Sequence, residues 1–492
     1  MSAPSPSIDI PGILAGHLGL AGIQQILKGR RARNALRSLL EEMLPGVALG
    51  PCRLTRSKYK PDRYLTAYYN AHYCEPGKEM DGRYQVRPVE VNWIREGAQV
   101  ARPDKADQAT MQSEAQKHGL VTPFRSLFTD APEWDMAVQV SPLDPDFPQL
   151  VRLSDPRFVQ TMLASLDVNG HDGTAVQNFF PSAVRAVSTM RYRPGQRHVL
   201  RYEFFEDTSD PVYAKLYNSP SKAARSLNVA NRVNRYLVER ASPINGARPL
   251  AYIPSEGVIL YPKVPGLPLS RLLRYSRSGT ARLLQMTGQA IRLLHQGPPE
   301  LAEGLDQKTF SGEVKATLQA SEHLAALHPK GLKSIAAILD LARKLYERLD
   351  PEPFTFTHSD FKSDHLMVAP TSLTLIDYDT CALADPALDV GKFLADLDWW
   401  HVIYNQGGVQ EAQAHFLTGY GQDTPKDRIE RARLFELLIL LKITVRRVPL
   451  FSPHWEELTN RLILQASAIL KDRLAFHAYP YPEQNALEQA LL

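Results

Sequence analysis

Hydrophobic and polar residues repeat at two different periods along this chain, and the period changes past its middle. Up to about residue 260, apolar residues take every second position in segments that predict strands over 52–59, 64–73, 84–94, 186–192, 198–205, 212–217 and 258–261. Spacings of three and four predict helices over 34–43, 155–166 and 221–241, and over most of the chain from about 270. A β-hairpin at 366–376 interrupts this helical part. Strands followed by helices predict an α+β fold with a sheet-rich lobe and a helical lobe.

Three short segments of the sheet-rich part recur in the same order. Residues 58–61 resemble 191–194, residues 88–93 resemble 211–216, and residues 148–153 resemble 268–273, at offsets of 133, 123 and 120. The ordered offsets predict a duplicated small lobe, with one copy over 34–154 and a second over 155–268. Chance similarity among proline-bounded strands is the alternative. Residues 1–33 are then an N-terminal lead-in, which is either a loose segment or an amphipathic helix. Residues 269–492 form the helical lobe.

Length, charge and cysteine content narrow the class of protein. A chain of 492 residues exceeds one ordinary core, so two to four units are expected. A formal charge of +4 gives no reason to expect nucleic acid or a membrane as partner, and the basic run 28–33 is expected to be a solvated helix face. Three scattered cysteines fit the reducing cytoplasm. Residues 10–27 contain four glycines and a histidine, and predict neither a signal peptide nor a membrane span.

The segment 357–379 carries the strongest chemical signal. Asp360 lies in a loop after an apolar run, where a carboxylate can receive the proton of an attacking hydroxyl group. Asp377 ends a strand of alternating apolar residues, and Asp379 points to the same side if that strand continues. Carboxylate oxygens suit Mg²⁺. His365, five residues after Asp360, is a further candidate metal ligand.

Other side chains near this segment have predicted roles in support. His358 is expected to brace the loop by hydrogen bonding. Lys362 is placed either beside the transferred phosphate or in solvent. Asp385 precedes a proline that suits the first turn of a helix, so it is interpreted as a helix cap. Asp389 is expected to brace the loop, and His295 to be a structural histidine.

Candidate nucleotide-binding residues lie upstream. Lys215, within the alternating strand 212–217, can reach the α- and β-phosphates of ATP as a point charge, although an edge-strand lysine alone is usually solvated. Arg193 and Arg197 belong to a basic hairpin turn and are candidate phosphate contacts. The stiff linker that follows has backbone groups near Tyr261 and Val264 that can pair with a purine edge, and an ordinary proline-rich connection is the alternative.

These residues together resemble the aminoglycoside phosphotransferase and choline kinase-like superfamily, which has a protein-kinase-like two-lobed fold. The similarity covers about 185–425, with its strongest part at 358–389 and support at Lys215, 264–269, 294–295 and 416–420. The resemblance implies an antiparallel-sheet small lobe and a mostly helical large lobe. It also implies that Asp360 is the catalytic base, Asp377 the principal Mg²⁺ ligand and Lys215 the phosphate anchor.

The chain departs from the family pattern at three points. His365 stands where the family has an asparagine metal ligand. Three alternatives follow: the site accepts Mn²⁺ beside Mg²⁺, a single metal site suffices, or His365 hydrogen-bonds a bound water. The basic turn 191–197 replaces a glycine-rich phosphate loop. Glu239 is the only acid in the helix 221–241 and lies late for a partner of Lys215.

The resulting hypothesis is a kinase that uses ATP or GTP to phosphorylate a hydroxyl group of a sugar, an amino sugar or an amino alcohol. The alternative is a catalytically impaired pseudokinase that binds a nucleotide or a protein. The first lobe copy has Asn92 where the second has Lys215, and it has no helical lobe of its own. It is therefore expected to be degenerate, and either to pack on the catalytic unit or to present a surface for a protein partner.

Overall fold

The chain forms two compact units in a computed structural model, which describes residues 8–476 except 78–83, 99–103, 167, 170–174, 177–179, 181–182, 207–208 and 275–277. The first unit comprises Met1–Ala224, Pro249–Lys263 and Pro449–Pro453. The second comprises Arg225–Arg248, Val264–Val448 and His454–Leu492. Helix α7, Pro220–Glu239, begins in the first unit and continues in the second.

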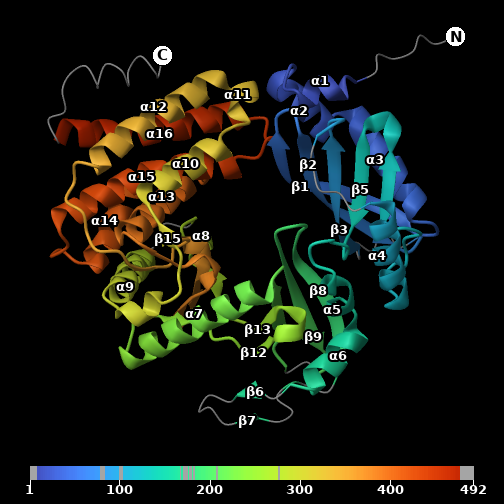
Figure 1. Cartoon of the computed structure of the whole chain (residues 1–492), viewed down its shortest axis with the longest axis horizontal. Coiled ribbons are helices and arrows are strands. Elements are labelled where there is room, and N and C mark those ends of the chain that lie inside the picture. The colour runs from blue at the N-terminus through green and yellow to red at the C-terminus, as the bar shows by residue number, and fades with distance from the viewer. Residues whose placement is uncertain are drawn as a thin grey trace. The chain divides into compact units, whose positions relative to one another are not determined.

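The first unit opens with helices and a five-stranded sheet, drawn in blue to cyan in Figure 1. The helices are α1 (Ile10–Leu14), α2 (Gly19–Lys28) and α3 (Arg30–Met43). The sheet contains β1 (Ala48–Lys60), β2 (Tyr64–Cys74), β3 (Gln85–Ile94), β5 (Met136–Val140) and β4 (Phe128–Ala131), antiparallel and in that spatial order. Helix α4 (Lys105–Lys117) connects β3 to β4. Lys28, Arg30, Arg31 and Arg33 are exposed, as expected of a solvated helix face.

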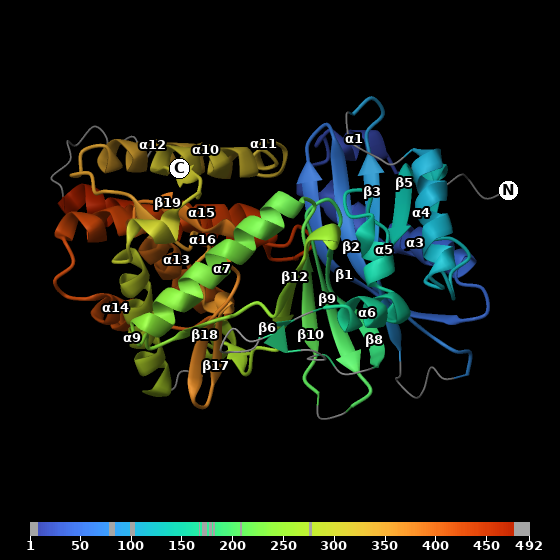
Figure 2. The same ribbon diagram turned by 60° about the horizontal axis from the view of Figure 1, so that its bottom comes forward.

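The same unit contains a second antiparallel sheet, which Figure 2 shows beside α6. Its order is β12 (Ala251–Ile253), β13 (Val258–Pro262), β10 (Val212–Leu216), β9 (Arg197–Phe204) and β8 (Val184–Arg193). Helices α5 (Gln149–Leu153) and α6 (Pro156–Ala164) precede it, with a two-stranded pair of β6 (Val168–Asn169) and β7 (Ala175–Val176). Alternate strand residues such as Leu200, Leu216 and Leu260 are buried in its core, so the predicted alternation marks the inward face.

The two sheets share one topology. In each, the spatial order of the strands by their rank in the chain is first, second, third, fifth and fourth, with a helix between the third and fourth. A 3-10 turn separates the last two strands of each sheet, at Pro132–Trp134 and at Pro254–Glu256. In the first sheet Asn92 pairs with Thr66 and Ala137. In the second, Lys215 pairs with Val199 and Ile259. Asn92 and Lys215 therefore occupy equivalent positions.

The end of the β8–β9 hairpin packs on the loop that follows β5. The buried carboxylate of Asp144 accepts hydrogen bonds from the backbone N–H of Gly195, at 2.9 Å, and from Nε2 of His198, at 2.6 Å. The hydroxyl group of Tyr192 donates to the carbonyl oxygen of Leu143 at 2.6 Å. Gly195 has a φ of +69°, so the turn uses a backbone conformation that favours glycine. The first sheet thus holds the turn of the second.

The second unit is mostly helical. Its helices after α7 are α8 (Leu269–Leu272), α9 (Ser278–His295), α10 (Phe310–Ala320), α11 (Leu324–Leu327), α12 (Pro329–Tyr346), α13 (Ala387–Ile403), α14 (Val409–Tyr420), α15 (Lys426–Arg447) and α16 (Trp455–Phe476). Helices α13 and α15 approach each other closely at Gly391. Any larger residue would clash there, because its Cβ atom would lie 2.3 Å from the carbonyl oxygen of Ala432. The predicted α+β fold, with antiparallel strands in one lobe and helices in the other, is confirmed.

Two small sheets interrupt the helices of the second unit. One contains β11 (Asn245–Gly246), β18 (Ser372–Leu375), β17 (Leu366–Ala369) and β14 (Leu267–Pro268). The other contains β15 (Gln307–Lys308), β19 (Ala382–Ala384) and β16 (Thr355–Thr357). The β17–β18 pair is the predicted hairpin.

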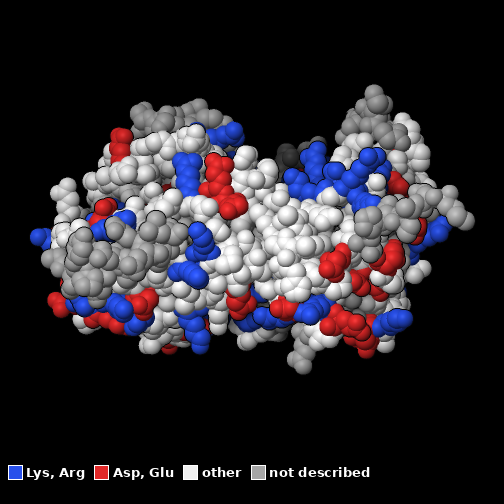
Figure 3. Space-filling view, turned by 90° about the horizontal axis from the view of Figure 1, so that it is seen from above, with Lys and Arg blue, Asp and Glu red and all other residues white. Residues whose placement is uncertain are grey.

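Surface charge and helix hydropathy complete the description. Figure 3 shows basic and acidic side chains interspersed on one face of the molecule, in line with the small formal charge of +4. Among the described residues, every helix is too short or too polar to cross a membrane.

Candidate active site

The β17–β18 hairpin brings together the two residues at its open end, His365 and Asp377. Its register pairs Leu366 with Leu375, so the residues just outside the pair must lie side by side. The backbone N–H of Ile376 accordingly donates to the carbonyl oxygen of His365 at 3.0 Å. Asp377 follows with a φ of +69°, which turns its side chain away from the strand direction. A local hairpin therefore places Asp377 beside His365.

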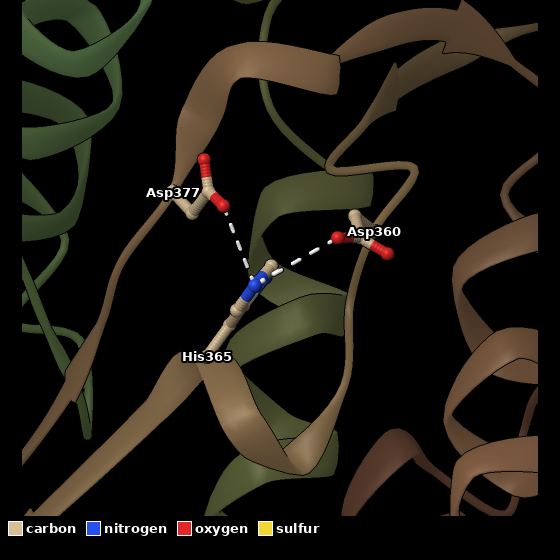
Figure 4. Close-up of side chains that lie close together, drawn as sticks. All are labelled: Asp360, His365 and Asp377. Carbon is tan, nitrogen blue, oxygen red and sulfur yellow. Dashed lines mark ion pairs between the residues drawn. The ribbon is translucent and has the colours of Figure 1, made fainter. Parts of the chain in front are cut away.

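Three side chains converge at this point. The Nε2 atom of His365 lies 3.4 Å from Oδ2 of Asp377 and 3.7 Å from Oδ2 of Asp360. Figure 4 shows the imidazole pointing toward both carboxylates. One ligand atom from each residue lies within 4.8 Å of the others. The predicted base and two of the predicted metal ligands are thus neighbours in space.

Asp360 is held as a carboxylate by two lysines. The Nζ atom of Lys362 donates to Oδ2 at 2.7 Å, and Nζ of Lys392 lies 3.0 Å from Oδ1. Burial acts to raise the pKa of Asp360, but the positive charges of Lys392 and Lys362 outweigh it and hold the pKa well below its usual range. Lys362 is largely buried against Asp360, so the alternative that placed it in solvent is wrong, and its placement beside the transferred phosphate stays a prediction.

His365 is neutral at physiological pH. Burial and the nearby Lys362 ammonium group lower its pKa to about 3. Its Nδ1 atom is buried without a hydrogen-bond partner among the described residues, so the ring is positioned mainly through Nε2. A neutral imidazole with two carboxylates is a donor set that fits a divalent cation, and its nitrogen is more favourable to Mn²⁺ than to Mg²⁺.

Helix α13 supports the loop that carries Asp360. The carboxylate of Asp389 accepts hydrogen bonds from the backbone N–H groups of His358 and Ser359, both at 2.7 Å. It also contacts Nε2 of His295 at 3.2 Å, and Nδ1 of that histidine contacts the hydroxyl group of Tyr420 at 2.8 Å. The predicted structural roles of Asp389 and His295 are confirmed. Ser359 has a φ of +60°, and these bonds stabilise that conformation.

Two further side chains of α13 reach the same loop. Lys392, three residues after Asp389, contacts Asp360. Asp396, four residues later, accepts from the backbone N–H of Ser363 at 2.8 Å. Residues at this spacing share one face of a helix, so α13 presents a polar stripe to the loop. Sequence reasoning missed Lys392, although its spacing from Asp389 was a usable signal.

His358 and Asp385 have the supporting contacts that were predicted for them. Nε2 of His358 donates to the carbonyl oxygen of Ile376 at 3.2 Å, and Nδ1 accepts from the backbone N–H of Asp360 at 3.3 Å. A ring that donates through one nitrogen and accepts through the other is neutral. Burial favours this state, because it lowers the pKa of His358. The carboxylate of Asp385 accepts from the backbone N–H of Ala387 at 2.8 Å, as a cap of α13 does.

Asp379 differs from its predicted position. The expected continuation of the strand is wrong, because β18 ends at Leu375 and Asp379 belongs to a 3-10 turn, Tyr378–Thr380. The positive φ of Asp377 ends the extended conformation. The Asp379 carboxylate accepts instead from the hydroxyl group of Ser226 on α7 at 2.8 Å. The group of three ligand atoms consists of Asp360, His365 and Asp377.

Four of the predicted nucleotide-binding residues lie in the first unit. Lys215 is buried on β10, with Nζ 5.8 Å from the centre of the Tyr217 ring. Arg193 and Arg197 pair across the end of the β8–β9 hairpin. Tyr261 is on β13. Val264, by contrast, belongs to the second unit.

The hairpin end concentrates positive charge. Burial, together with the nearby guanidinium groups of Arg56, Arg191 and Arg197, lowers the pKa of Arg193 to about 10. Arg56 is on β1, so the first sheet contributes to this cluster. An anion beside these groups would relieve their mutual repulsion. The cluster therefore has the chemistry of a phosphate contact.

Comparisons with known proteins show similarity over part of the chain. A family model described as the phosphotransferase enzyme family matches residues 191–434. No curated protein matches the chain. Among solved structures, the chain is similar to an aminoglycoside 2'-phosphotransferase-IIIa in complex with GDP, at 16% identity over 61% of this chain and 96% of that chain, with a TM-score of 0.41.

Two other solved structures are similar to the same extent. A choline/ethanolamine kinase family protein from Mesorhizobium loti has 13% identity over 59% of this chain and 89% of that chain, with a TM-score of 0.37. An amicoumacin kinase in complex with AMP-PNP and Ca²⁺ has 14% identity over 63% of this chain and 93% of that chain, with a TM-score of 0.41.

Proposed function

Residues 191–434 belong to the phosphotransferase enzyme family, and on this premise we propose that the chain transfers the terminal phosphoryl group of ATP or GTP to a hydroxyl group of a small molecule. Sugars, amino sugars and amino alcohols are the proposed acceptors. The observation that carries the proposal is the meeting of Asp360, His365 and Asp377, where an ionised carboxylate lies beside a group suited to a divalent cation.

In the proposed reaction, Asp360 orients the acceptor hydroxyl group for in-line attack. A bond forms between the acceptor oxygen and the terminal phosphorus, the bond from phosphorus to the bridging oxygen breaks, and the proton passes to Asp360. A carboxylate with two lysine contacts is a weak base. Proton transfer therefore comes late, after most of the bond to the leaving group has broken, which suits a loose transition state.

Asp377 and His365 are the proposed ligands of a divalent cation, Mg²⁺ or Mn²⁺. When bound, the cation supplies positive charge that neutralises the phosphate oxygens. With a pKa of about 3, His365 is neutral at pH 7, so one of its two ring nitrogens is free of a proton and can bind a cation. The structural support from α13 keeps the Asp360 loop in place without help from the cation.

Lys215, Arg193 and Arg197 are the proposed contacts of the nucleotide phosphates, and the backbone near Tyr261 and Val264 is proposed to pair with the purine. The burial of Lys215 on β10 and the clustering of guanidinium groups at the hairpin end support this assignment, since both place positive charge where a phosphate group can bind. Glu239, the last residue of α7, is exposed. Its position at the very end of α7 agrees with the expectation that it lies late for a partner of Lys215.

We also propose that the two sheets of the first unit are copies of one lobe. Their common strand order and the equivalent registers of Asn92 and Lys215 support a duplication. In this proposal the first copy has lost its lysine and now has a structural role. Its loop at Asp144 fixes the hairpin end that carries Arg193 and Arg197.

The two copies lead to a paired test of nucleotide binding. We expect Lys215→Ala to weaken binding of a non-hydrolysable ATP or GTP analogue about tenfold to a hundredfold, because a charged hydrogen bond contributes about 1.5–3 kcal/mol. We expect Asn92→Ala at the equivalent position to change it less than twofold. Fluorescence titration of both variants measures the difference. Equal losses in the two variants would show that the second copy has no special part in binding.

A direct assay tests the proposed reaction. The full chain is incubated with ATP or GTP, with Mg²⁺ or Mn²⁺, and with a panel of sugars, amino sugars and amino alcohols, and phosphorylated products are identified by mass spectrometry. The proposal expects a product that carries one added phosphoryl group on a hydroxyl oxygen. If no acceptor is phosphorylated while nucleotide still binds, the pseudokinase alternative replaces it.

A further inference from the structure

The first sheet has a cavity that the proposed reaction does not use. It has a volume of about 570 Å³, within the size range of small-molecule sites. Its floor consists of polar side chains from β1, β2, β3 and β5, namely Lys58, Thr66, Tyr68, Glu90, Asn92 and Gln139. The hairpin turn 194–196 and the start of α4 complete its walls.

The position of this cavity follows from the shared topology of the two sheets. Asn92 lines the cavity and is equivalent to Lys215, so the cavity covers the face that carries the lysine in the second sheet. The missing lysine leaves an uncharged amide there. Its Oδ1 atom accepts a hydrogen bond from the hydroxyl group of Thr66 at 2.5 Å.

The charges around this cavity are mostly negative. Its lining includes six carboxylates and two lysines: Glu90, Asp104, Asp107, Asp130, Asp144 and Asp146 against Lys58 and Lys105. The lining itself attracts a cation and repels phosphate groups, while the guanidinium groups of Arg56 and Arg193, which interact with Tyr68, place positive charge beside it. Asp144 already binds the hairpin end. Glu90 is therefore the carboxylate of the floor that can meet a ligand.

We propose that this cavity is a second small-molecule site, which binds an organic cation through an ammonium group held by Glu90. Tyr68 and Asn92 hydrogen-bond to the Glu90 carboxylate and orient it. Thr66 and Gln139 also line this floor. The Thr66 hydroxyl group donates to Asn92 and the Gln139 amide group donates to Leu143 and Tyr192, so these two residues offer their side-chain oxygen atoms as acceptors for such a ligand. The cavity lining does not include Asp360, His365 or Asp377, and it meets the proposed nucleotide contacts only at the turn 194–196, between Arg193 and Arg197.

Calorimetric titration of the full chain at pH 8 and 0.15 M salt tests the site, with spermidine as the cation and inorganic triphosphate as an anion. We expect spermidine to bind, and Glu90→Gln to weaken its binding at least tenfold, as the loss of a charged hydrogen bond implies. Glu256→Gln is the matched control, because Glu256, in the 3-10 turn between β12 and β13, has the same 9% exposure and pairs with Arg152. We expect that control to bind within twofold of the wild type.

A second variant keeps the test decisive if Glu90→Gln does not fold. Asn92→Lys places an ammonium group in the cavity, as in the second sheet, and we expect it to abolish spermidine binding. Asp360→Asn should leave that binding unchanged, since it alters the candidate active site alone. The proposal is overturned if the wild type does not bind spermidine, if triphosphate competes for the cavity, or if Asn92→Lys binds spermidine as well as the wild type does.

The pH dependence of binding gives an independent readout. Burial and the charge of Asp144 raise the pKa of Glu90 to about 7, against the lowering effects of Tyr68 and Lys58. Tyr192, which also faces Glu90, is buried with its pKa raised well above its usual value, so it stays neutral. Glu90 is protonated below its pKa and loses its attraction for a cation. Spermidine should therefore bind more weakly at pH 6 than at pH 8 in the wild type, and equally at both in Glu90→Gln.

Discussion

The substitution Asp360→Asn is expected to lower kcat by two to four orders of magnitude, the range that a general base contributes. Asparagine has the same shape, but its amide cannot receive the proton of the acceptor hydroxyl group. Nucleotide affinity should not fall, because the substitution removes a negative charge near the phosphates. Steady-state kinetics with the best acceptor of the panel, together with titration of a nucleotide analogue, separate the two effects.

A matched control lies in the same loop. Asp364 is a carboxylate of the 3-10 turn Ser363–His365 and accepts a hydrogen bond from the hydroxyl group of Ser270 at 2.6 Å. Asp364→Asn alters the loop charge equally, yet it leaves the converging group of Asp360, His365 and Asp377 intact. We expect it to retain kcat within a few-fold. Unchanged turnover in Asp360→Asn would refute the role of that residue as base, whatever the control does.

The two lysines that contact Asp360 affect how the Asp360→Asn result is interpreted. Lys362 and Lys392 both contact the carboxylate, so the asparagine variant leaves two ammonium groups without their partner. Burying an unpaired charge is costly. Thermal unfolding of the variant must therefore accompany the kinetic comparison. A folded variant with intact nucleotide binding and lost turnover isolates the proton-transfer step from a structural defect.

Much of this site was accessible from the sequence because its geometry is local. The alternating apolar residues of the 366–376 hairpin fix a register, and the register places His365 beside Asp377. The distance of Asp360 from His365 is limited in the same way by a loop of a few residues. The strand order of the sheets could not be predicted residue by residue. The repeated offsets nevertheless matched Asn92 with Lys215, as the registers do.

The features that sequence reasoning missed depend on packing or on one backbone dihedral angle. Lys392 reaches Asp360 from a helix that begins 27 residues later, so only the approach of α13 reveals the contact. Asp379 was misplaced because a positive φ at Asp377 ends the strand conformation. The contact between Asp144 and the hairpin end joins residues 51 positions apart. Hydropathy patterns indicate local secondary structure and do not report such tertiary contacts.

Asp377→Asn is expected to reduce the affinity for Mn²⁺ at least tenfold and to lower kcat a hundredfold or more. A charged oxygen ligand becomes a neutral one, while the shape of the side chain is kept. Electron paramagnetic resonance of free Mn²⁺, measured with the full chain and a nucleotide analogue, reports binding directly. Asp379→Asn is the matched control, because its carboxylate bonds to Ser226 outside the converging group. Equal losses of affinity in the two variants would contradict the assignment of Asp377 as the principal ligand.

The substitution His365→Asn tests whether His365 binds the cation of the same site. The change replaces a neutral imidazole with an amide oxygen, a ligand that Mg²⁺ accepts more readily than nitrogen. We expect the ratio of the activity with Mg²⁺ to the activity with Mn²⁺ to rise in this variant. A change in the protonation of His365 does not account for such a rise, because the pKa of about 3 keeps the ring neutral near pH 7. A ratio that stays the same would mean that His365 positions the two carboxylates and does not bind the cation.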